Sequence, residues 1–229
     1  MNHDAVFWDV GGVILNIESI TRAQEAFVRA LIDEYDLRMT DAEALAAWRD
    51  GMREHFAGRQ GREYRTARDA RRKAAEALFD GEPPADWRDR HTEVSNDIVE
   101  LNPGVAETVR TLSEAGVYQA VVSDADEGLV DRIARFGLDE YFDDVTTSEE
   151  VGYVKPDRRM FETALEKARR AGVDPERGVM IGDKYENDME GASRFGLTTV
   201  AYGADDGPAV DHRIDDVREL LPIVGVEER

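Results

Sequence analysis

Apolar residues follow two different periodicities along the chain. Short, nearly continuous apolar runs predict buried strands of a parallel sheet that is covered on both faces. Such runs lie at 5–8, 117–122 and 178–181, and further short strands are expected near 144–147 and at 198–201. Helical patterns predict helices from about 104 to 116 and near 126–136, 157–171, 187–195 and 215–222. Strands that alternate with helices predict an α/β fold with a doubly wound parallel sheet.

The stretch from Ile17 to Leu101 has a different pattern. It is rich in Ala, Arg, Glu and Asp, and Phe27, Leu31 and Tyr35 fall at helical spacing. Breaks at Gly58–Gly61 and Gly81–Pro84 divide it. The pattern predicts four helices and no strand, with the helices at about 20–36, 40–57, 61–79 and 84–100. We therefore expect an all-helical domain, residues 19–101, inserted into a core domain formed by residues 1–18 and 102–229.

Three of the predicted strands end in a polar side chain. Asp9 follows the first strand and precedes a pair of glycines, Ser123 follows the second, and Asp183 follows the fourth. Lys155 precedes a helix whose first turn suits Pro156. Because the carboxyl ends of parallel strands meet at one edge of a sheet, and open α/β sheets bind ligands there, we expect these side chains to converge.

This set of groups suits phosphate chemistry. Carboxylates and backbone carbonyls are the oxygen ligands that Mg²⁺ prefers, and Mg²⁺ often bridges to a substrate phosphate. A carboxylate also acts as a nucleophile and forms an aspartyl-phosphate. A lysine and a hydroxyl at the strand ends suit phosphoryl oxygens, whose charge must be stabilised during transfer.

Four motifs in order carry a resemblance to a known family. They are Asp9-Val-Gly-Gly-Val, Ser123, Lys155-Pro156 and Gly182-Asp183-Lys-Tyr-Glu-Asn-Asp188. Each motif is short, but their order and spacing resemble the haloacid dehalogenase-like (HAD) hydrolase superfamily over nearly the whole chain. The inserted helices resemble that superfamily's C1-type cap. The resemblance implies a Rossmann-like HAD core with an inserted helical cap.

The resemblance also implies a role for each motif residue. The implied catalytic residues are Asp9, Ser123 and Lys155, with Asp9 as the nucleophile. The implied Mg²⁺ ligands are Asp9, the Gly11 carbonyl, Asp183 and Asp188. The implied substrate-binding residues are Ser123, Asp124 and Lys155.

Two residues depart from the superfamily's usual pattern. Phosphatases of this superfamily usually carry a second Asp two residues after the nucleophile, where it acts as general acid and base, and this chain has Gly11 there. Such help contributes on the order of 10²–10⁴-fold. Asp124 stands where an Asn is common, and it adds negative charge near an anion site.

Three functions are compatible with these motifs. We expect a Mg²⁺-dependent phosphatase that acts on a small phosphorylated metabolite through an aspartyl-phosphate. A 2-haloacid dehalogenase is the first alternative, because that subfamily also lacks the second Asp. A catalytically weak binding or regulatory module is the other, and Gly11 is its main support. Asp9, Lys155 and Asp183 together favour an enzyme, and Asp183 favours a metal, which dehalogenation does not need.

The composition limits the chemistry, the partners and the cellular location that we expect for this protein. The chain has 229 residues, no cysteine and a net charge of −21, and 41% of its residues are hydrophobic. We therefore expect a packed core, no disulfide and no thiolate chemistry. The negative charge makes nucleic acid and anionic membranes poor partners. With four lysines and many carboxylates, the composition is typical of a halophilic protein. The lack of a signal-peptide pattern or membrane-spanning run predicts a cytoplasmic protein. Its expected partner is a small phosphorylated substrate, and we expect a monomer or a homodimer.

Overall fold

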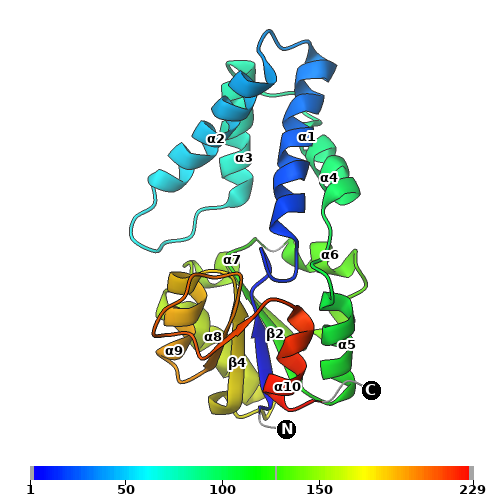
Figure 1. Ribbon diagram of the computed structural model, residues 1–229. Helices are drawn as coiled ribbons and strands as arrows, with labels where there is room; N and C mark the ends of the chain where they lie inside the picture. The colour runs from blue at the N-terminus through cyan, green and yellow to red at the C-terminus, as the bar shows by residue number, and fades with distance from the viewer. Residues whose placement is uncertain (1–2, 127, 227–229) are drawn as a thin grey trace. The chain divides into compact units, whose positions relative to one another are not determined.

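The computed structural model describes residues 3–126 and 128–226, and it divides into two compact units (Figure 1). The core unit comprises the described residues of Met1–Leu15 and Leu101–Arg229, and the helical unit comprises Asn16–Glu100. The sequence pattern placed the two boundaries after residues 18 and 101.

The helical unit consists of four helices around an aromatic centre. Trp48 and Phe27 are buried and meet edge to face, with ring centroids 5.3 Å apart. Thr40 begins the second helix through a reciprocal capping box with Glu43, because each side chain accepts the other residue's backbone N–H. The helices are α1 Ile17–Tyr35, α2 Asp41–Ala57, α3 Ala67–Phe79 and α4 Trp87–Ile98.

Helix α3 begins later than the pattern predicted. The expected start was near residue 61, but Gly61 has a positive φ of 58° and lies in a loop. The Thr66 side chain accepts the backbone N–H of Asp69 and caps the helix there. The glycine and the capping threonine together fix the start of α3 at Ala67.

The core unit contains a six-stranded sheet in which every pair of neighbouring strands is parallel. The strand order is β3-β2-β1-β4-β5-β6, so the first strand lies in the middle. This confirms the predicted doubly wound α/β fold. The strands are β1 Ala5–Trp8, β2 Tyr118–Ser123, β3 Asp144–Thr147, β4 Gly178–Gly182, β5 Thr198–Tyr202 and β6 His212–Ile214.

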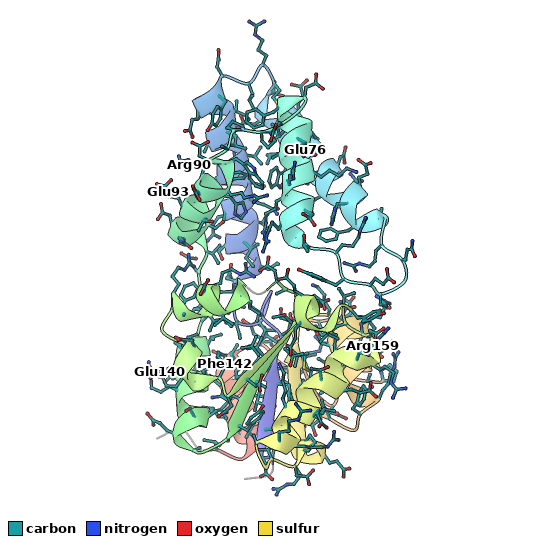
Figure 2. All side chains as sticks on the ribbon, turned by 180° about the vertical axis from the view of Figure 1, so that it is seen from behind. Glu76, Arg90, Glu93, Glu140, Phe142 and Arg159 are labelled. Atoms are coloured by element: carbon teal, nitrogen blue, oxygen red, sulfur yellow. The ribbon has the colours of Figure 1, made fainter. Side chains whose placement is uncertain are left out.

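Helices cover both faces of this sheet. Figure 1 shows α8 and α9 on one side and α5 and α10 on the other. On the α8 side, Phe7 and Met180 of the sheet pack against Phe161. The alternate residue Trp8 is also buried, and Phe142, labelled in Figure 2, lies edge-on to it at 6.4 Å. The helices are α5 Val105–Glu114, α6 Leu129–Ala134, α7 Ser148–Val151, α8 Arg158–Arg170, α9 Gly191–Ser193 and α10 Leu220–Val224.

Some connections differ from the predicted elements. The helix expected at 187–195 is a π-helical turn, Tyr185–Glu190, followed by α9. The last predicted helix begins with a 3₁₀ turn, Val217–Glu219, which leads into α10. Strand β6 was not predicted because two of its three residues are exposed and polar. Further 3₁₀ turns are Asp139–Tyr141 and Pro175–Arg177. Among the described residues, no helix combines the length and apolarity needed to span a membrane.

Candidate active site

The carboxyl edge of the sheet brings together the side chains that end its strands. In the register of β1, Trp8 pairs with Val121 of β2 and with Ile181 of β4. Asp9 follows Trp8 at the centre of the sheet, and its N–H donates to the Ile181 carbonyl at 3.0 Å. Ser123 and Asp183 follow these partners by two residues, so they lie on the two sides of Asp9.

Lys155 connects two carboxylates at this edge. Its Nζ donates to Asp9 Oδ1 at 2.7 Å and to Asp188 Oδ1 at 2.6 Å, and its side chain is 2% exposed. Burial disfavours the ammonium charge, but Asp188, Asp9 and Asp124 outweigh burial and raise the pKa of Lys155 above its usual range. The side chain is therefore a permanent cation in contact with the candidate nucleophile.

A further carboxylate at this edge belongs to Asp183, and its hydrogen-bonding capacity is not satisfied within the described part of the chain. Among the described residues, no hydrogen-bond partner is found for its buried Oδ1. Burial and the charge of Asp9 raise the pKa of Asp183 to about 6. Burial likewise raises the pKa of Asp188 to about 6, although Lys155 opposes the shift. Ionisation of Asp183 and of Asp188 is thus unfavourable unless further positive charge lies nearby.

This arrangement fits a divalent cation. Asp9, Asp183 and Asp188 each offer an oxygen, and these atoms lie within 4.8 Å of one another. Lys155 and the Lys184 N–H already bind the two oxygens of Asp188. The unpartnered Oδ1 makes Asp183 the more open ligand. An all-oxygen set of this kind suits Mg²⁺.

Two glycines permit the close packing of these carboxylates. Gly12 has a φ of +93°, and a Cβ atom there would lie 2.2 Å from Asp183 Oδ2. A Cβ atom at Gly182 would lie 2.2 Å from the Cβ of Asp188. At Gly11 the corresponding space is open, with nothing within 4 Å. Glycine is therefore required at position 12, whereas position 11 has room for a side chain.

Asp124 makes its contacts within the protein. Its Oδ1 accepts the backbone N–H of Lys155 at 2.8 Å and the hydroxyl of Ser148 at 3.0 Å. The residue as a whole is exposed, whereas Ser123 beside it is buried. Besides its predicted place near substrate, Asp124 therefore has a structural role, because its carboxylate anchors the segment that carries Lys155.

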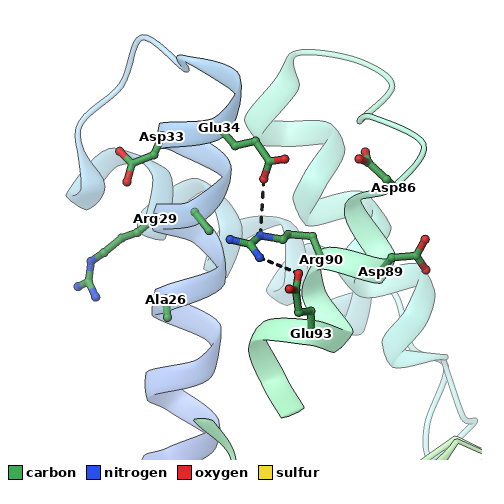
Figure 3. Close-up of a pocket in the computed structure, with 9 residues that line it drawn as sticks. Ala26, Arg29, Asp33, Glu34, Asp86, Asp89, Arg90 and Glu93 are labelled. Atoms are coloured by element: carbon green, nitrogen blue, oxygen red, sulfur yellow. Dashed lines mark hydrogen bonds and ion pairs between the residues drawn. The ribbon is translucent and has the colours of Figure 1, made fainter. Parts of the chain in front are cut away.

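The helical unit contains a hollow of about 1080 Å³ between α1 and α4 (Figure 3). Its charged lining residues are Arg29, Asp33, Glu34, Asp86, Asp89, Arg90 and Glu93. The guanidinium of Arg90 lies 2.7 Å from Glu93 and 3.6 Å from Glu34, so carboxylates of the same hollow already neutralise its charge. Five carboxylates against two guanidinium groups make this surface unfavourable for an anionic ligand.

The fold and the strand-end cluster agree with the comparison to known families. The family of haloacid dehalogenase-like hydrolases matches residues 3–196. Since this is most of the chain, the protein belongs to the haloacid dehalogenase-like hydrolase family, and the resemblance seen in the four motifs is confirmed.

Several known proteins are similar to this chain. It is 36% identical over 135 residues to a glyceraldehyde 3-phosphate phosphatase of Methanopyrus kandleri, which covers 53% of this chain and 55% of that protein. The chain thus spans about half the length of that relative. A HAD phosphatase from Thermococcus onnurineus has a TM-score of 0.75 at 24% identity, with 99% and 100% of the two chains covered. A 2-haloacid dehalogenase from Pseudomonas syringae has a TM-score of 0.70 at 25% identity, with 97% of each covered.

Sequence reasoning did not identify two further residues beside the cluster. Gly12 was noted only as a member of the glycine pair after Asp9, and no close packing against Asp183 was predicted for it. Asn102 appeared only as the first residue of the second core segment, with no role predicted for its side chain. Its side chain is buried and binds the loop that follows Asp9. A buried role for Asn102 has no counterpart in the motif pattern.

Proposed function

We propose that this protein is a Mg²⁺-dependent phosphatase that hydrolyses small phosphorylated metabolites through an aspartyl-phosphate on Asp9. One observation carries the proposal. A buried, permanently charged Lys155 contacts Asp9, and a second carboxylate, Asp183, lies beside them with an unsatisfied oxygen. A nucleophile, a cation and an open oxygen ligand at one strand edge are what phosphoryl transfer requires.

Each step of the proposed reaction uses a group of this chain. An oxygen of Asp9 attacks phosphorus, the bond to the leaving-group oxygen breaks, and the phosphoryl group remains on Asp9 as an acyl phosphate. Water then hydrolyses this acyl phosphate, which releases inorganic phosphate and restores the carboxylate. Lys155 orients Asp9 through its hydrogen bond to Oδ1, and with Ser123 it binds phosphoryl oxygens. Mg²⁺ bound by Asp9, Asp183 and the Gly11 carbonyl, with Asp188 in support, would neutralise the negative charge of carboxylates and phosphate.

Gly11 has no side chain that could protonate the leaving group. In the proposed reaction the leaving oxygen therefore takes its proton from water or from the substrate. Leaving groups that are weak bases need this proton least, so we propose a preference for acyl and aryl phosphates over alkyl phosphates.

A 2-haloacid dehalogenase is the second candidate, and Gly11 is the observation that favours it. In that reaction Asp9 would attack carbon, displace halide and form an ester that water hydrolyses. The unsatisfied oxygen of Asp183 argues for the phosphatase instead, because a dehalogenase does not need a metal ion beside its nucleophile.

The deciding experiment is a panel of acyl, aryl and alkyl phosphates together with 2-chloropropionate, assayed in molar KCl with MgCl₂ or with EDTA. We expect phosphate release that requires Mg²⁺ and no chloride release. Asp9→Asn should abolish turnover and leave the fold intact, because an amide cannot form the covalent intermediate. Chloride release without Mg²⁺ would establish the dehalogenase, and no turnover of any compound would favour a binding module.

We also propose the cellular setting that composition favours, a salt-rich cytoplasm in which the protein is a monomer or a homodimer. A net charge of −21 repels itself at low ionic strength, and salt screens this repulsion. The unfolding temperature should therefore rise from dilute buffer to molar KCl. Light scattering at both salt concentrations would give the oligomeric state.

A further inference from the structure

Asn102 binds three consecutive carbonyls of the loop that follows the candidate nucleophile. Its side-chain Nδ2 donates to the carbonyls of Gly12 and Val13, each at 2.8 Å. Its backbone N–H donates to the carbonyl of Ile14 at 2.9 Å. The residue is 7% exposed and comes 93 positions after Asp9, at the point where the chain returns to the core unit. Asn102 itself lies outside the four family motifs.

The neighbouring carbonyls of the same loop are also engaged. The Val10 carbonyl accepts the N–H groups of Ile14 and Leu15, and the Gly12 N–H donates to the Leu15 carbonyl at 2.9 Å. Within the described residues, no donor to the Gly11 carbonyl is found. From Val10 to Ile14, the single carbonyl left open is thus the one that the family resemblance assigns to the metal.

The orientation of this open carbonyl depends on its neighbours. The Gly11 carbonyl and the Gly12 N–H belong to one planar peptide, so they point in opposite directions. The Leu15 carbonyl fixes the N–H side of that plane, and Asn102 fixes the next two carbonyls. Glycine at positions 11 and 12 gives the loop no stiffness of its own, since glycine backbones adopt many conformations.

We propose that Asn102 is a positioning residue that holds the Gly11 carbonyl in place for the divalent cation; this rests on the proposed Mg²⁺-dependent function. An amide suits the task because its two N–H hydrogens serve two carbonyls at once. Serine offers one hydrogen and alanine none, so the loop should lose one and then both side-chain bonds.

Gln119 is a matched control for the loss of such bonds. It is also buried, and its Nε2 donates to two backbone carbonyls, those of Val109 at 2.8 Å and Tyr141 at 3.2 Å. It is the second residue of β2, so it lies toward the opposite end of the strand from Ser123. Gln119→Ala should therefore weaken the fold without reaching the metal ligands.

The experiment measures Mg²⁺ affinity by titration calorimetry on the folded full chain at low temperature in molar KCl. We expect Asn102→Ala to raise the Mg²⁺ dissociation constant roughly 10- to 100-fold, the range found for groups that orient metal ligands. Asn102→Ser should fall between wild type and Asn102→Ala. Gln119→Ala should lower the unfolding temperature but bind Mg²⁺ as wild type does.

The outcomes separate this inference from the proposed function. If wild type binds no Mg²⁺, the proposed function is wrong. If wild type binds it and Asn102→Ala has a dissociation constant within twofold of wild type, the positioning role is wrong and the function stands. If Asn102→Ala does not fold, the dissociation constant of Asn102→Ser is compared with that of wild type by the same criterion. If neither variant folds, Asn102 is a structural residue and the positioning proposal is also wrong.

Discussion

The packing of Gly12 against Asp183 leads to a specific prediction for Gly12→Ala. At a φ of +93°, an alanine is strained by about 1–2 kcal/mol relative to glycine. Its Cβ atom would lie 2.2 Å from Asp183 Oδ2, whereas ordinary contacts begin at 3.4 Å. Relief of that overlap requires a relative movement of about 1 Å, and a misplacement of about 1 Å can reduce turnover on the order of 10²-fold.

The assay combines kinetics, Mg²⁺ titration and thermal unfolding of the variant. We expect kcat/KM to fall on the order of 10²-fold. The strain should lower the unfolding temperature by roughly 2–8 °C for a chain of this size. Gly116→Ala is the matched control, because Gly116 has a φ of +76° but nothing within 4 Å of its virtual Cβ atom. It should show the loss of stability alone.

The comparison of the two variants tests the reasoning directly. If Gly12→Ala and Gly116→Ala lose similar stability and both retain wild-type kcat/KM, the contact between Gly12 and Asp183 does not constrain the site. If Gly116→Ala also loses activity, backbone strain acts at a distance and the argument from the Cβ overlap is wrong.

Three further predictions concern charge and the missing acid. Asp183→Asn should stabilise the fold in EDTA by about 1 kcal/mol after solvent screening, because it removes a charge that burial and Asp9 both disfavour, and it should abolish stabilisation by Mg²⁺; a less stable variant than wild type in EDTA would contradict this. Gly11→Asp, with its open space, should improve kcat/KM for alkyl phosphates relative to aryl phosphates; an unchanged ratio would mean that another group supplies the proton. Burial raises the pKa of Tyr118 to about 12, so the unfolded chain ionises first and stability should fall from about pH 10 to pH 12; urea unfolding of Tyr118→Phe should show a weaker decline.

The sequence pattern predicted the strand ends well because burial and chemistry coincide there. An apolar run that ends in Asp9, and another that ends before Asp183, carry a signal that is local to a few residues. The sheet then brings these ends together by the general rule for parallel strands, so the convergence with Lys155 required no knowledge of strand order.

Other features depend on contacts that a local pattern does not encode. The π-helical turn at Tyr185–Glu190 resembled an ordinary helix in sequence, although close packing of Asp188 on Gly182 accompanies it. The start of α3 was set by Thr66, which the pattern placed inside a longer helix. The role of Asn102 rests on partners about 90 positions earlier in the chain, and a single sequence holds no signal for such a pairing.

The two bonds of Lys155 also have a consequence for how this protein acquires its activity. One partner carboxylate is 146 positions away in the chain and the other is 33 positions away. Contacts between distant segments form only after the loops between them have closed, which is slow compared with the formation of single helices. During refolding, the helices of Asn16–Glu100 can therefore regain their circular dichroism signal while the site is still unassembled. A fragment that ends before β4 lacks Asp183 and Asp188 and thus has no complete site, however well its helices fold.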